Sequence, residues 1–579
     1  MPVRRILRLL PWPLRRRVLG SARRLLSVAA PEHRLWLARR IVPLGPPPRP
    51  WVAADAVTMR VRAGRARVTA RRDPAASPAG VRRANLDRVV AALGYAGIDW
   101  FRVPARCCTH TAVAVPERDR ARVLGVLSAL TASDHGLIEV VAVRGRPPRR
   151  HRADVLRVCW PVTDPGGNLV LGADYGCEVE FWRERDGLLT APRGNPVADV
   201  VAVDEPVVSA PEAVFSEFSA PDGTARYRTR QVFTMASPDR VGFAVDVVYT
   251  WVDGDDPAWR ARKAQALGAN PWVTGASEHT ANNSRFASRD ELRYSLRSLH
   301  YFAPWIRRIF LVTDDQVPDW LDTGHPGLTV VSHREIFGDT GRLPTFNSHA
   351  IESRLHRIPG LSEHFLYLND DVFLGRPVTP GLFFTPGGLT RFFPSRALVD
   401  SAPRRPDDPP VNSAGKNNRR LIQEAFGRVL TRKMMHTPHP SRRSVIAEIE
   451  DRFAEHVEAT AAHQFRHPDD VSLLSSLQQY YAYLTGRAAP GEIKYAYADL
   501  ADPATPFKLA RVLRNRQLDA FCLNDTHSDA RTAAEQEALL ADFLPAYLPF
   551  VSVFELSSPR VAVVGRQPTR RPSRAEIVA

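Results

Sequence analysis

Residues 360–376 read GLSEHFLYLNDDVFLGR, and this stretch decides the expected fold. Its residues 365–368 form a short apolar run, which is typical of a strand buried on both faces of a sheet. Asn369, Asp370 and Asp371 follow directly. Adjacent carboxylates repel each other unless a cation lies between them, and Mg²⁺ or Mn²⁺ accepts such oxygen ligands. The stretch therefore predicts a metal site at the carboxyl edge of an open sheet, where α/β folds bind ligands; a plain Asn-Asp turn is the alternative.

Other apolar runs earlier in the chain end in the same way. They are residues 245–252 (VDVVYTWV), 307–313 (RRIFLVT) and 328–332, and acidic residues follow at 253–256 and 314–315. Helical spacing over residues 289–301 and 351–358 places helices between these runs. The alternation predicts an α/β fold with a mainly parallel sheet and helices on its faces. Three acidic strand ends predict one polar edge where several loops converge.

Composition limits the classes of partner. The 579 residues carry a net charge of +17, and 44% of them are hydrophobic, which is enough for two to four domains. The positive charge predicts anionic partners such as phosphates or a membrane surface. No zinc-finger or RNA-binding pattern occurs, so we expect no nucleic acid. An odd number of cysteines without framework spacing indicates a reducing compartment. All five are expected to be structural: Cys107, Cys108, Cys159, Cys177 and Cys522.

The chain divides into four predicted regions. Residues 1–50 are rich in arginine and end in a proline-rich linker, and they are either a basic amphipathic segment on anionic lipid or a solvated tail. Residues 51–240 form an α/β accessory module without a catalytic constellation, so a helper role and acceptor recognition both stay open. Residues 241–565 form the catalytic domain, within which residues 402–420 are expected to be a mobile loop. Residues 566–579 read as a disordered tail.

Longer motifs resemble one known family. They are DVVYTWVDGDDP (246–257), ELRYSLRSLHYFAPWIRRIFLVTD (291–314), LPTFNSHAIESRLHRIPGLSEHFLYLNDDVFLGRPV (343–378), HTPHPSRRSVIAEIEDRF (436–453), HQFRHPDDVSLLSSLQQYYAYLTGR (463–487) and CLND (522–525). In this order they resemble the four characteristic regions of the Stealth family of bacterial capsular and exopolysaccharide phosphotransferases. The resemblance covers residues 245–530.

The resemblance implies an enzyme. Such an enzyme moves a sugar-1-phosphate from a nucleotide diphosphate sugar to a hydroxyl of a glycan acceptor and releases the nucleoside monophosphate. It also implies a nucleotide-sugar-binding sheet of the Rossmann-like or GT-A-like kind and a cytoplasmic protein, in contact with the inner face of the membrane if residues 1–50 bind lipid.

Phosphoryl transfer needs positioning and charge neutralisation, and three roles follow. Asp370, Asp371 and Asp525 are the predicted ligands of Mg²⁺ or Mn²⁺. Arginine binds phosphate through two hydrogen bonds, which makes Arg293, Arg354 and Arg466 candidate clamps. Histidine is the natural base near neutral pH. The candidates are His439, between two prolines in a segment read as too polar for a core, and His349, with His356 and His436 behind them.

The remaining predicted substrate-binding residues are Asp253, Asp256, Asn347 and Asn369. Several candidates have simpler readings. Asn347 could only cap a helix, Arg354 could only form a surface ion pair, and His349 and His356 could belong to an apolar helix face. Asn524 and Asp525 could form a turn.

Two other functions remain open at this point. A conventional glycosyltransferase would use the same kind of sheet, but it would release the nucleoside diphosphate. A non-catalytic protein that binds glycan or membrane is the third reading, although the NDD, TPHP and CLND groups are all intact.

Overall fold

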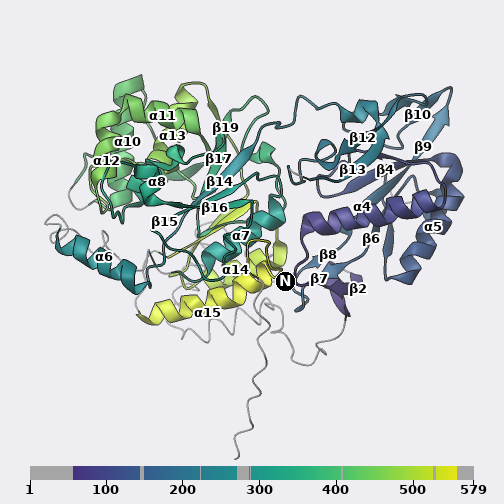
Figure 1. Ribbon diagram of the computed structural model, residues 1–579, viewed down its shortest axis with the longest axis horizontal. Coiled ribbons are helices and arrows are strands. Elements are labelled where there is room, and N and C mark those ends of the chain that lie inside the picture. Colours follow the sequence, from purple (N-terminus) through teal and green to yellow (C-terminus); the bar gives the residue numbers. More distant parts are fainter. Residues whose placement is uncertain are drawn as a thin grey trace, which may run out of the picture.

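The computed structural model describes residues 57–64, 66–143, 149–221, 223–269, 286, 288–405, 408–525 and 530–556. The predicted basic segment 1–50 and the predicted tail 566–579 lie outside these residues. Figure 1 shows the N-terminal strands with α4 and α5 on one side of the molecule and the helices α10–α13 on the other. Within the described residues no helix is long and apolar enough to cross a membrane.

A five-stranded sheet organises the C-terminal part. Its strands are β14 (Val245–Thr250), β15 (Ile309–Thr313), β16 (Leu328–Ser332), β17 (His364–Asn369) and β22 (His439–Arg442). The spatial order is β16-β15-β14-β17-β22, in which the first four strands run parallel and β22 pairs antiparallel with β17. The predicted mainly parallel sheet is therefore confirmed. Because β14 is the first of these strands in the chain, the order reverses between β14 and β17.

Helices cover both faces of this sheet. On one face lies α7 (Glu291–Phe302), whose Leu292, Leu296 and Leu299 are buried at the predicted helical spacing. The other face packs against α8 (His333–Phe337), α9 (Ser348–Glu352), α11 (Arg443–Arg452) and α13 (Gln478–Leu484). Alternate residues of the strands enter the two cores, so Val247 and Val248 face opposite sides. Of the remaining helices, α12 spans Ala454–Ala462 and α6 spans Pro257–Gly268.

A second, three-stranded sheet begins directly after Asp371. It has the order β18-β25-β24, formed by β18 (Val372–Leu374), β25 (Ala520–Asn524) and β24 (Tyr495–Asp499). The turn at Asp370 and Asp371 therefore connects the two sheets. Helices α14 (Thr505–Asn515) and α15 (Ala530–Tyr547) pack against each other beside this sheet. Two small sheets complete this part: β19 (Thr390–Phe392) with β23 (Ala488–Pro490), and β20 (Pro394–Leu398) with β21 (Arg432–Met434).

The N-terminal part contains two sheets and two long helices. The four-stranded sheet has the order β1-β2-β7-β8: Thr58–Ala63, Ala66–Arg72, Val162–Thr163 and Val170–Leu171. The nine-stranded sheet contains β3 (Phe101–Val103), β4 (Thr111–Pro116), β5 (Leu137–Val140), β6 (Val155–Cys159), β9 (Cys177–Arg185), β10 (Leu188–Thr190), β11 (Val200–Ala202), β12 (Val207–Pro211) and β13 (Arg226–Arg230). Helices α4 (Pro78–Tyr95) and α5 (Arg120–Ser133) pack against this sheet.

The two parts share apolar contacts. Most buried residues of the N-terminal part form a core of their own. Val81, Val162 and Phe218, however, belong to the same core as β14 and α7. The predicted boundary near residue 240 therefore stays a prediction, because a continuous core joins the chain on its two sides.

The predicted mobile loop at residues 402–420 is wrong for its second half. Helix α10 spans Pro410–Phe426 and buries Ala414, Asn418 and Leu421. Asn417 donates hydrogen bonds from its side chain to the carbonyl oxygens of Pro468 and Asp470, at 2.8 Å each. Glycine and asparagine lower the intrinsic helix propensity of this segment, but tertiary contacts override it.

Candidate functional site

The strand ends converge as predicted from the parallel sheet. Thr250 of β14 lies opposite Asn369 of β17, and Thr313 of β15 lies opposite Ser332 of β16. Asn369 is thus the last residue of its strand, and the loops that follow leave from the same edge. Asp370 and Asp371 lie beside the position where the strand order reverses, which is where open α/β sheets form a ligand crevice.

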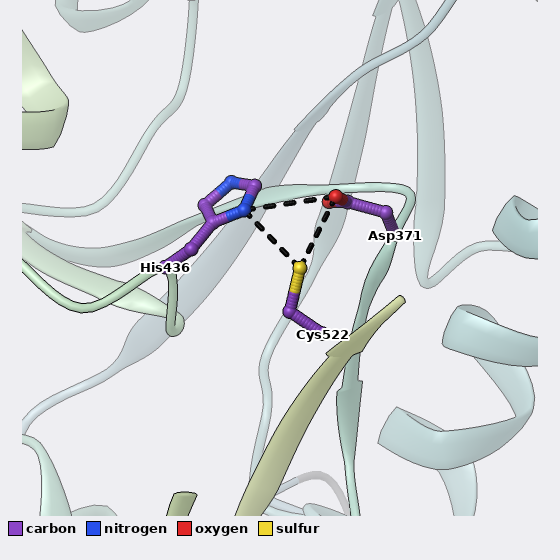
Figure 2. Close-up of side chains that lie close together, drawn as sticks. All are labelled: Asp371, His436 and Cys522. Carbon is purple, nitrogen blue, oxygen red and sulfur yellow. Dashed lines mark hydrogen bonds and ion pairs between the residues drawn. The ribbon is translucent and has the colours of Figure 1, made fainter. Parts of the chain in front are cut away.

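Asp371, His436 and Cys522 meet at this edge from three distant segments (Figure 2). The Cys522 thiol lies 3.3 Å from Asp371 Oδ2 and 3.3 Å from His436 Nδ1, and His436 Nδ1 lies 3.6 Å from the same carboxylate oxygen. Burial and the charge of Asp371 raise the pKa of Cys522 well above its ordinary value, so its thiol keeps its proton. The thiol can therefore donate to Asp371 Oδ2.

The second carboxylate oxygen of Asp371 is different. Oδ1 is buried and has no hydrogen-bond partner among the described residues. The backbone holds the carboxylate in place, because Leu523 N–H donates to the Asp371 carbonyl at 3.0 Å and Val372 pairs with Cys522. A buried carboxylate oxygen without a partner is costly unless something binds it. One oriented oxygen is thus available for a cation.

Acidic side chains surround this turn. Burial and the charges of Glu291 and Asp371 raise the pKa of Asp370 well above its ordinary value. Burial likewise raises the pKa of Glu291, which begins helix α7. Asp525 lies beyond β25 and forms an ion pair of 3.0 Å with Arg289. Asp370, Asp371 and Glu291 are thus three interacting carboxylates, which is the chemical environment that Mg²⁺ or Mn²⁺ neutralises, so these residues fit the predicted ion; the predicted ligand Asp525 is instead paired with Arg289.

The acidic side chains that follow β14 form hydrogen bonds within their own loop. Asp253 Oδ1 accepts a hydrogen bond from the N–H of Asp255, and Asp256 caps helix α6 through Ala258 N–H at 2.8 Å. Gln316 ties this loop to the end of β15, since its amide donates to the Asp253 carbonyl and to Asp256 Oδ2. The structure therefore places Asp253 and Asp256 at the predicted edge, with a structural role for Asp256.

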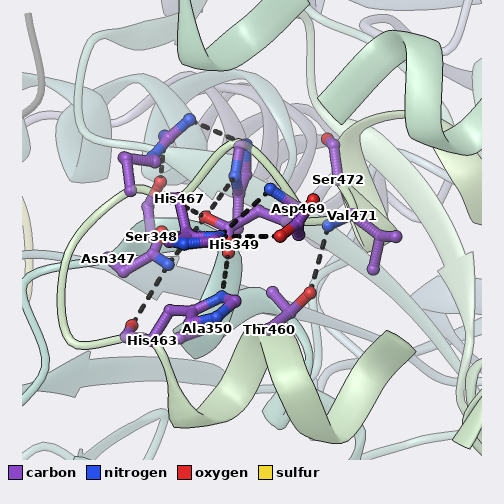
Figure 3. Close-up of polar contacts among 12 residues, drawn as sticks. Asn347, Ser348, His349, Ala350, Thr460, His463, His467, Asp469, Val471 and Ser472 are labelled. Carbon is purple, nitrogen blue, oxygen red and sulfur yellow. Dashed lines mark hydrogen bonds and ion pairs between the residues drawn. The ribbon is translucent and has the colours of Figure 1, made fainter. Parts of the chain in front are cut away.

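A second polar cluster includes Asn347, His349 and His463 (Figure 3) and surrounds the buried carboxylate of Asp470. Its Oδ2 accepts from the Asn347 amide at 2.8 Å and lies 3.4 Å from His349 Nδ1, while Oδ1 lies 2.8 Å from His463 Nδ1. Burial alone would raise the pKa of Asp470, but the hydrogen bonds from His349 and His463 outweigh it and hold that pKa below its usual range. Asn347 also caps helix α9, as its simpler reading predicted.

Arg466 extends this cluster. Its guanidinium donates to His349 Nε2 at 2.7 Å and to the Ser348 hydroxyl. Because guanidinium only donates, Nε2 must accept, and the His349 proton lies on Nδ1 toward Asp470. Burial, then the charge of Arg466, lower the pKa of His349, which keeps the ring neutral. Unlike Arg293 and Arg354, Arg466 forms no ion pair within the described residues.

Tyr367 links the two clusters. Its hydroxyl lies 3.2 Å from Thr250 Oγ1, and burial followed by the charge of Glu352 raises its pKa. The charge of Arg466 lowers the pKa of the same hydroxyl and the charge of Asp371 raises it, so both clusters lie within electrostatic reach of Tyr367. A positive group and an acidic group thus approach the same strand end.

His439, the first choice for the base, lies in a core. It is 5% exposed, belongs to β22 and stacks on Tyr367 with ring centroids 6.3 Å apart. The expectation of a polar, rigid surface segment is therefore wrong, because antiparallel pairing with β17 buries it. Burial, with a contribution from His436, lowers the pKa of His439 to about 3. His436 is the more accessible ring, with 28% of its side chain exposed.

Three further candidates lie in ion pairs elsewhere. Arg354 is fully buried and binds Glu450 and Glu458, which is more than the surface pair of its simpler reading. His356 Nε2 lies 2.7 Å from Glu450, and Arg293 Nε lies 2.5 Å from Glu555. Each of these groups already has a carboxylate partner in another part of the domain, so the structure does not bring them to the cluster around Asp371.

Sequence reasoning missed four residues of these clusters: Cys522, Glu291, Asp470 and His463. Cys522 was grouped with the structural cysteines, although it begins CLND. His463 and Asp470 flank Arg466 in HQFRHPDD, and the density of titratable residues in that segment was the available signal. Nothing local in the sequence marks Glu291, because its burial depends on packing against the turn after β17.

Models of four conserved regions of Stealth proteins match the chain. Conserved region 1 matches residues 243–271, region 2 residues 285–392, region 3 residues 435–483 and region 4 residues 510–563. The clusters around Asp371 and Asp470 are built from regions 2, 3 and 4. A solved galactosyltransferase in complex with donor and acceptor sugar analogues is similar at 13% identity and a TM-score of 0.27, over 52% of this chain and 96% of that one; a likeness this weak carries no argument.

Curated relatives cover most of the chain. An exopolysaccharide phosphotransferase of Streptomyces coelicolor is 48% identical over 83% of this chain and 84% of its own length. Another from that organism is 46% identical over 83% of this chain and 85% of its own length. The exopolysaccharide phosphotransferase CpsY of Mycobacterium leprae is 36% identical over 76% of this chain and 80% of its own length. The chain therefore belongs to the Stealth family of exopolysaccharide phosphotransferases.

Proposed function

We propose that this enzyme transfers a sugar-1-phosphate from a nucleotide diphosphate sugar to a hydroxyl group of a glycan, in exopolysaccharide synthesis. The observation that carries the proposal is the oriented Asp371 Oδ1, which has no partner among the described residues and lies at the edge where the strand order reverses. Membership of the family supports it, since the relatives are named exopolysaccharide phosphotransferases.

The reaction breaks the bond between the bridging oxygen of the donor's diphosphate and the phosphorus that carries the sugar. The acceptor oxygen forms a new bond to the phosphorus that carries the sugar, and the nucleoside monophosphate leaves with the bridging oxygen. The acceptor hydroxyl gives up one proton. Catalysis of this kind depends on positioning and on neutralising charge.

Asp370 and Asp371 would hold Mg²⁺ or Mn²⁺. The ion supplies positive charge to the phosphate oxygens of the donor. Cys522 and His436 orient Asp371 through its Oδ2, which leaves Oδ1 as the ligand atom. Partners that orient a ligand in this way raise the affinity and the geometric precision of metal sites.

Arg466 is the proposed clamp for the transferred phosphoryl group. Its present partners, His349 and Ser348, are neutral acceptors, so its charge is not neutralised by a direct ion pair in the described structure. A guanidinium held by neutral acceptors can still bind a phosphate through charge-assisted hydrogen bonds. Asp470, Asn347 and His463 hold His349, and through it they position Arg466.

His436 is the proposed base. It lies beside Asp371 and is partly exposed, whereas burial leaves His439 with a pKa of about 3 and little proton affinity near neutral pH. Asp371 Oδ2 lies near Nδ1 of His436, which leaves Nε2 for the acceptor hydroxyl. The acceptor proton would move to this nitrogen.

The finer fold and location belong to the same proposal. The parallel strands lie in the order β16-β15-β14-β17, so that the third, second, first and fourth strands of the chain are neighbours. This order supports a Rossmann-like or GT-A-like nucleotide-sugar sheet. We further propose a cytoplasmic enzyme that contacts the anionic inner face of the membrane through residues 1–50. Sedimentation of the full chain with anionic vesicles but not with neutral vesicles would support that contact.

The decisive experiment identifies the released nucleotide. The purified protein is incubated with a panel of nucleotide sugars, Mn²⁺ and a glycan acceptor, and the products are identified by mass spectrometry. A nucleoside monophosphate together with a phosphate diester on the glycan supports the proposal. A nucleoside diphosphate would instead establish an ordinary glycosyltransferase.

A further inference from the structure

The N-terminal part contains a pocket of about 300 Å³ that is not used by the site described above. It lies between the four-stranded sheet and the N-terminal half of α4, and Figure 1 shows β2, β7 and β8 grouped next to this helix. Its lining also includes the loop at Asp134 and His135 that follows α5. Pockets of this volume lie at the lower limit for small-molecule sites, so a ligand of one or two sugar rings has the right size.

Trp160 forms one wall of the pocket and is 6% exposed. Asn85 fixes the backbone at Trp160, because the Asn85 amide oxygen accepts from the backbone N–H of Trp160 at 3.0 Å while its amide nitrogen donates to the Tyr175 carbonyl at 2.9 Å. The indole Nε1 of Trp160 is buried and has no hydrogen-bond partner in the described part of the chain. Ala76 and Val162 add apolar surface.

Charged groups at the pocket occur in balanced pairs. Arg71 lies 3.0 Å from Asp73, and Arg88 lies 2.8 Å from Asp134. Arg88 also lies over the ring of Trp160, with its guanidinium carbon 5.0 Å from the ring centroid. Two carboxylates beside two guanidinium groups favour neither an anion nor a cation. They instead offer acceptors and donors for the hydroxyl groups of a neutral ligand.

The helix terminus beside the pocket does not change this conclusion. Ser77 caps α4, and its hydroxyl accepts from the N–H of Gly80 at 3.1 Å. Pro78 at the start of the helix has no N–H to donate. Gly80 and Val81 thus donate to Ser77, and Pro78 has no N–H, so this helix end offers the pocket few of the backbone donors that a phosphate site uses.

We propose that this pocket binds one or two sugar units of a neutral glycan, so that the N-terminal part holds the acceptor. A sugar ring has an apolar face of C–H groups that can pack against the apolar part of the lining, and it has hydroxyl groups that suit paired carboxylates and guanidinium groups. This inference rests on the proposed function for its choice of acceptor, but glycan binding here can be measured without any turnover.

The test fills the pocket. Ala84 lines it and lies on the exposed side of α4, so Ala84→Phe adds bulk without removing a buried contact. Ala91→Phe is the matched control, on the same helix, also exposed and outside the pocket. Binding of cellobiose, N,N′-diacetylchitobiose and glucose 1-phosphate is measured by saturation-transfer NMR and calorimetry on the full chain. An Asp371→Asn background removes any effect of turnover.

We expect at least one neutral disaccharide to bind, with a Kd at least tenfold higher in Ala84→Phe and unchanged in Ala91→Phe. Asp134→Asn, an exposed substitution, should weaken the same binding about threefold to tenfold. It tests the pocket independently in case Ala84→Phe does not fold. Equal binding in Ala84→Phe and wild type, no binding of either neutral probe, or preferential binding of glucose 1-phosphate would each overturn the proposal. Release of a nucleoside diphosphate with binding at this pocket intact would overturn only the proposed function.

Discussion

The guanidinium of Arg466 donates to Nε2 of His349 at 2.7 Å, and the other nitrogen of that ring faces Asp470 at 3.4 Å. A carboxylate, a neutral imidazole and a guanidinium thus form a chain in which each group fixes the next. The cation is oriented without being neutralised by a direct contact, which suits a group that must receive a phosphate. Arg466 and Asp371 act with opposite effects on the pKa of Tyr367, so opposite charges lie within electrostatic reach of one strand end.

Replacing Arg466 by Ala should lower kcat/KM for the nucleotide sugar by roughly a hundredfold to a thousandfold, because a charge-assisted contact with the transferring group is lost. Arg466→Lys should recover only part of this loss, since an ammonium cannot form two parallel hydrogen bonds. Arg293→Lys is the matched control, because Arg293 is paired with Glu555. Equal losses in Arg466→Ala and in the control would show that Arg466 has no special role.

Asp371→Asn should abolish turnover while the circular dichroism spectrum persists. The amide keeps the shape of the side chain but removes the charge, so binding of Mn²⁺, measured by electron paramagnetic resonance, should weaken at least tenfold. Asp255→Asn serves as control, because this carboxylate is 69% exposed and no role is proposed for it. Full activity of Asp371→Asn with Mn²⁺ present would reject the metal site at this residue.

Cys522 separates two models of that site. If its thiol only orients Asp371 Oδ2, Cys522→Ser keeps a donor and should retain activity within about tenfold, while Cys522→Ala should lose more. If the sulfur itself binds the metal, both variants should lose affinity for Mn²⁺ and Zn²⁺ alike. Metal titrations of the two variants distinguish these outcomes, and unchanged kinetics in Cys522→Ala would exclude both models.

The two histidines of HTPHP (436–440) can be separated by their kinetics. His436→Gln should lower kcat far more than it changes donor binding, because a base acts on the acceptor and not on the donor. His439→Phe preserves the stack on Tyr367 and should keep most of kcat. A larger loss of kcat in His439→Phe than in His436→Gln would return the role of base to His439.

The features of the fold that the sequence predicted well are those determined by residues close together in the chain. Apolar runs that end in carboxylates predicted the parallel strands and their polar edge. The sequence of a few adjacent residues is enough to indicate that a strand is buried and where it ends. His439 was misjudged because its burial comes from pairing with β17, more than seventy residues earlier. Arg354 likewise meets Glu450, 96 residues away. Such partners depend on the assembled fold, and no local pattern specifies them.

His439 also predicts how stability depends on pH. Its pKa in the folded protein is about 3, whereas an unfolded histidine titrates near its ordinary value of about 6.5. Between these values only the unfolded chain takes up the proton, so the stability of the fold is retained above pH 6.5 and falls as the pH drops. At pH 5 the difference amounts to about 2 kcal/mol for this one group. The free energy of unfolding is measured with urea for wild type and His439→Phe at pH 7.5 and pH 5.0. Between these two pH values it should fall by about 2 kcal/mol less in the variant than in wild type. Other buried histidines cancel in this comparison, so an identical loss in both proteins would mean that His439 is not neutral and buried in solution.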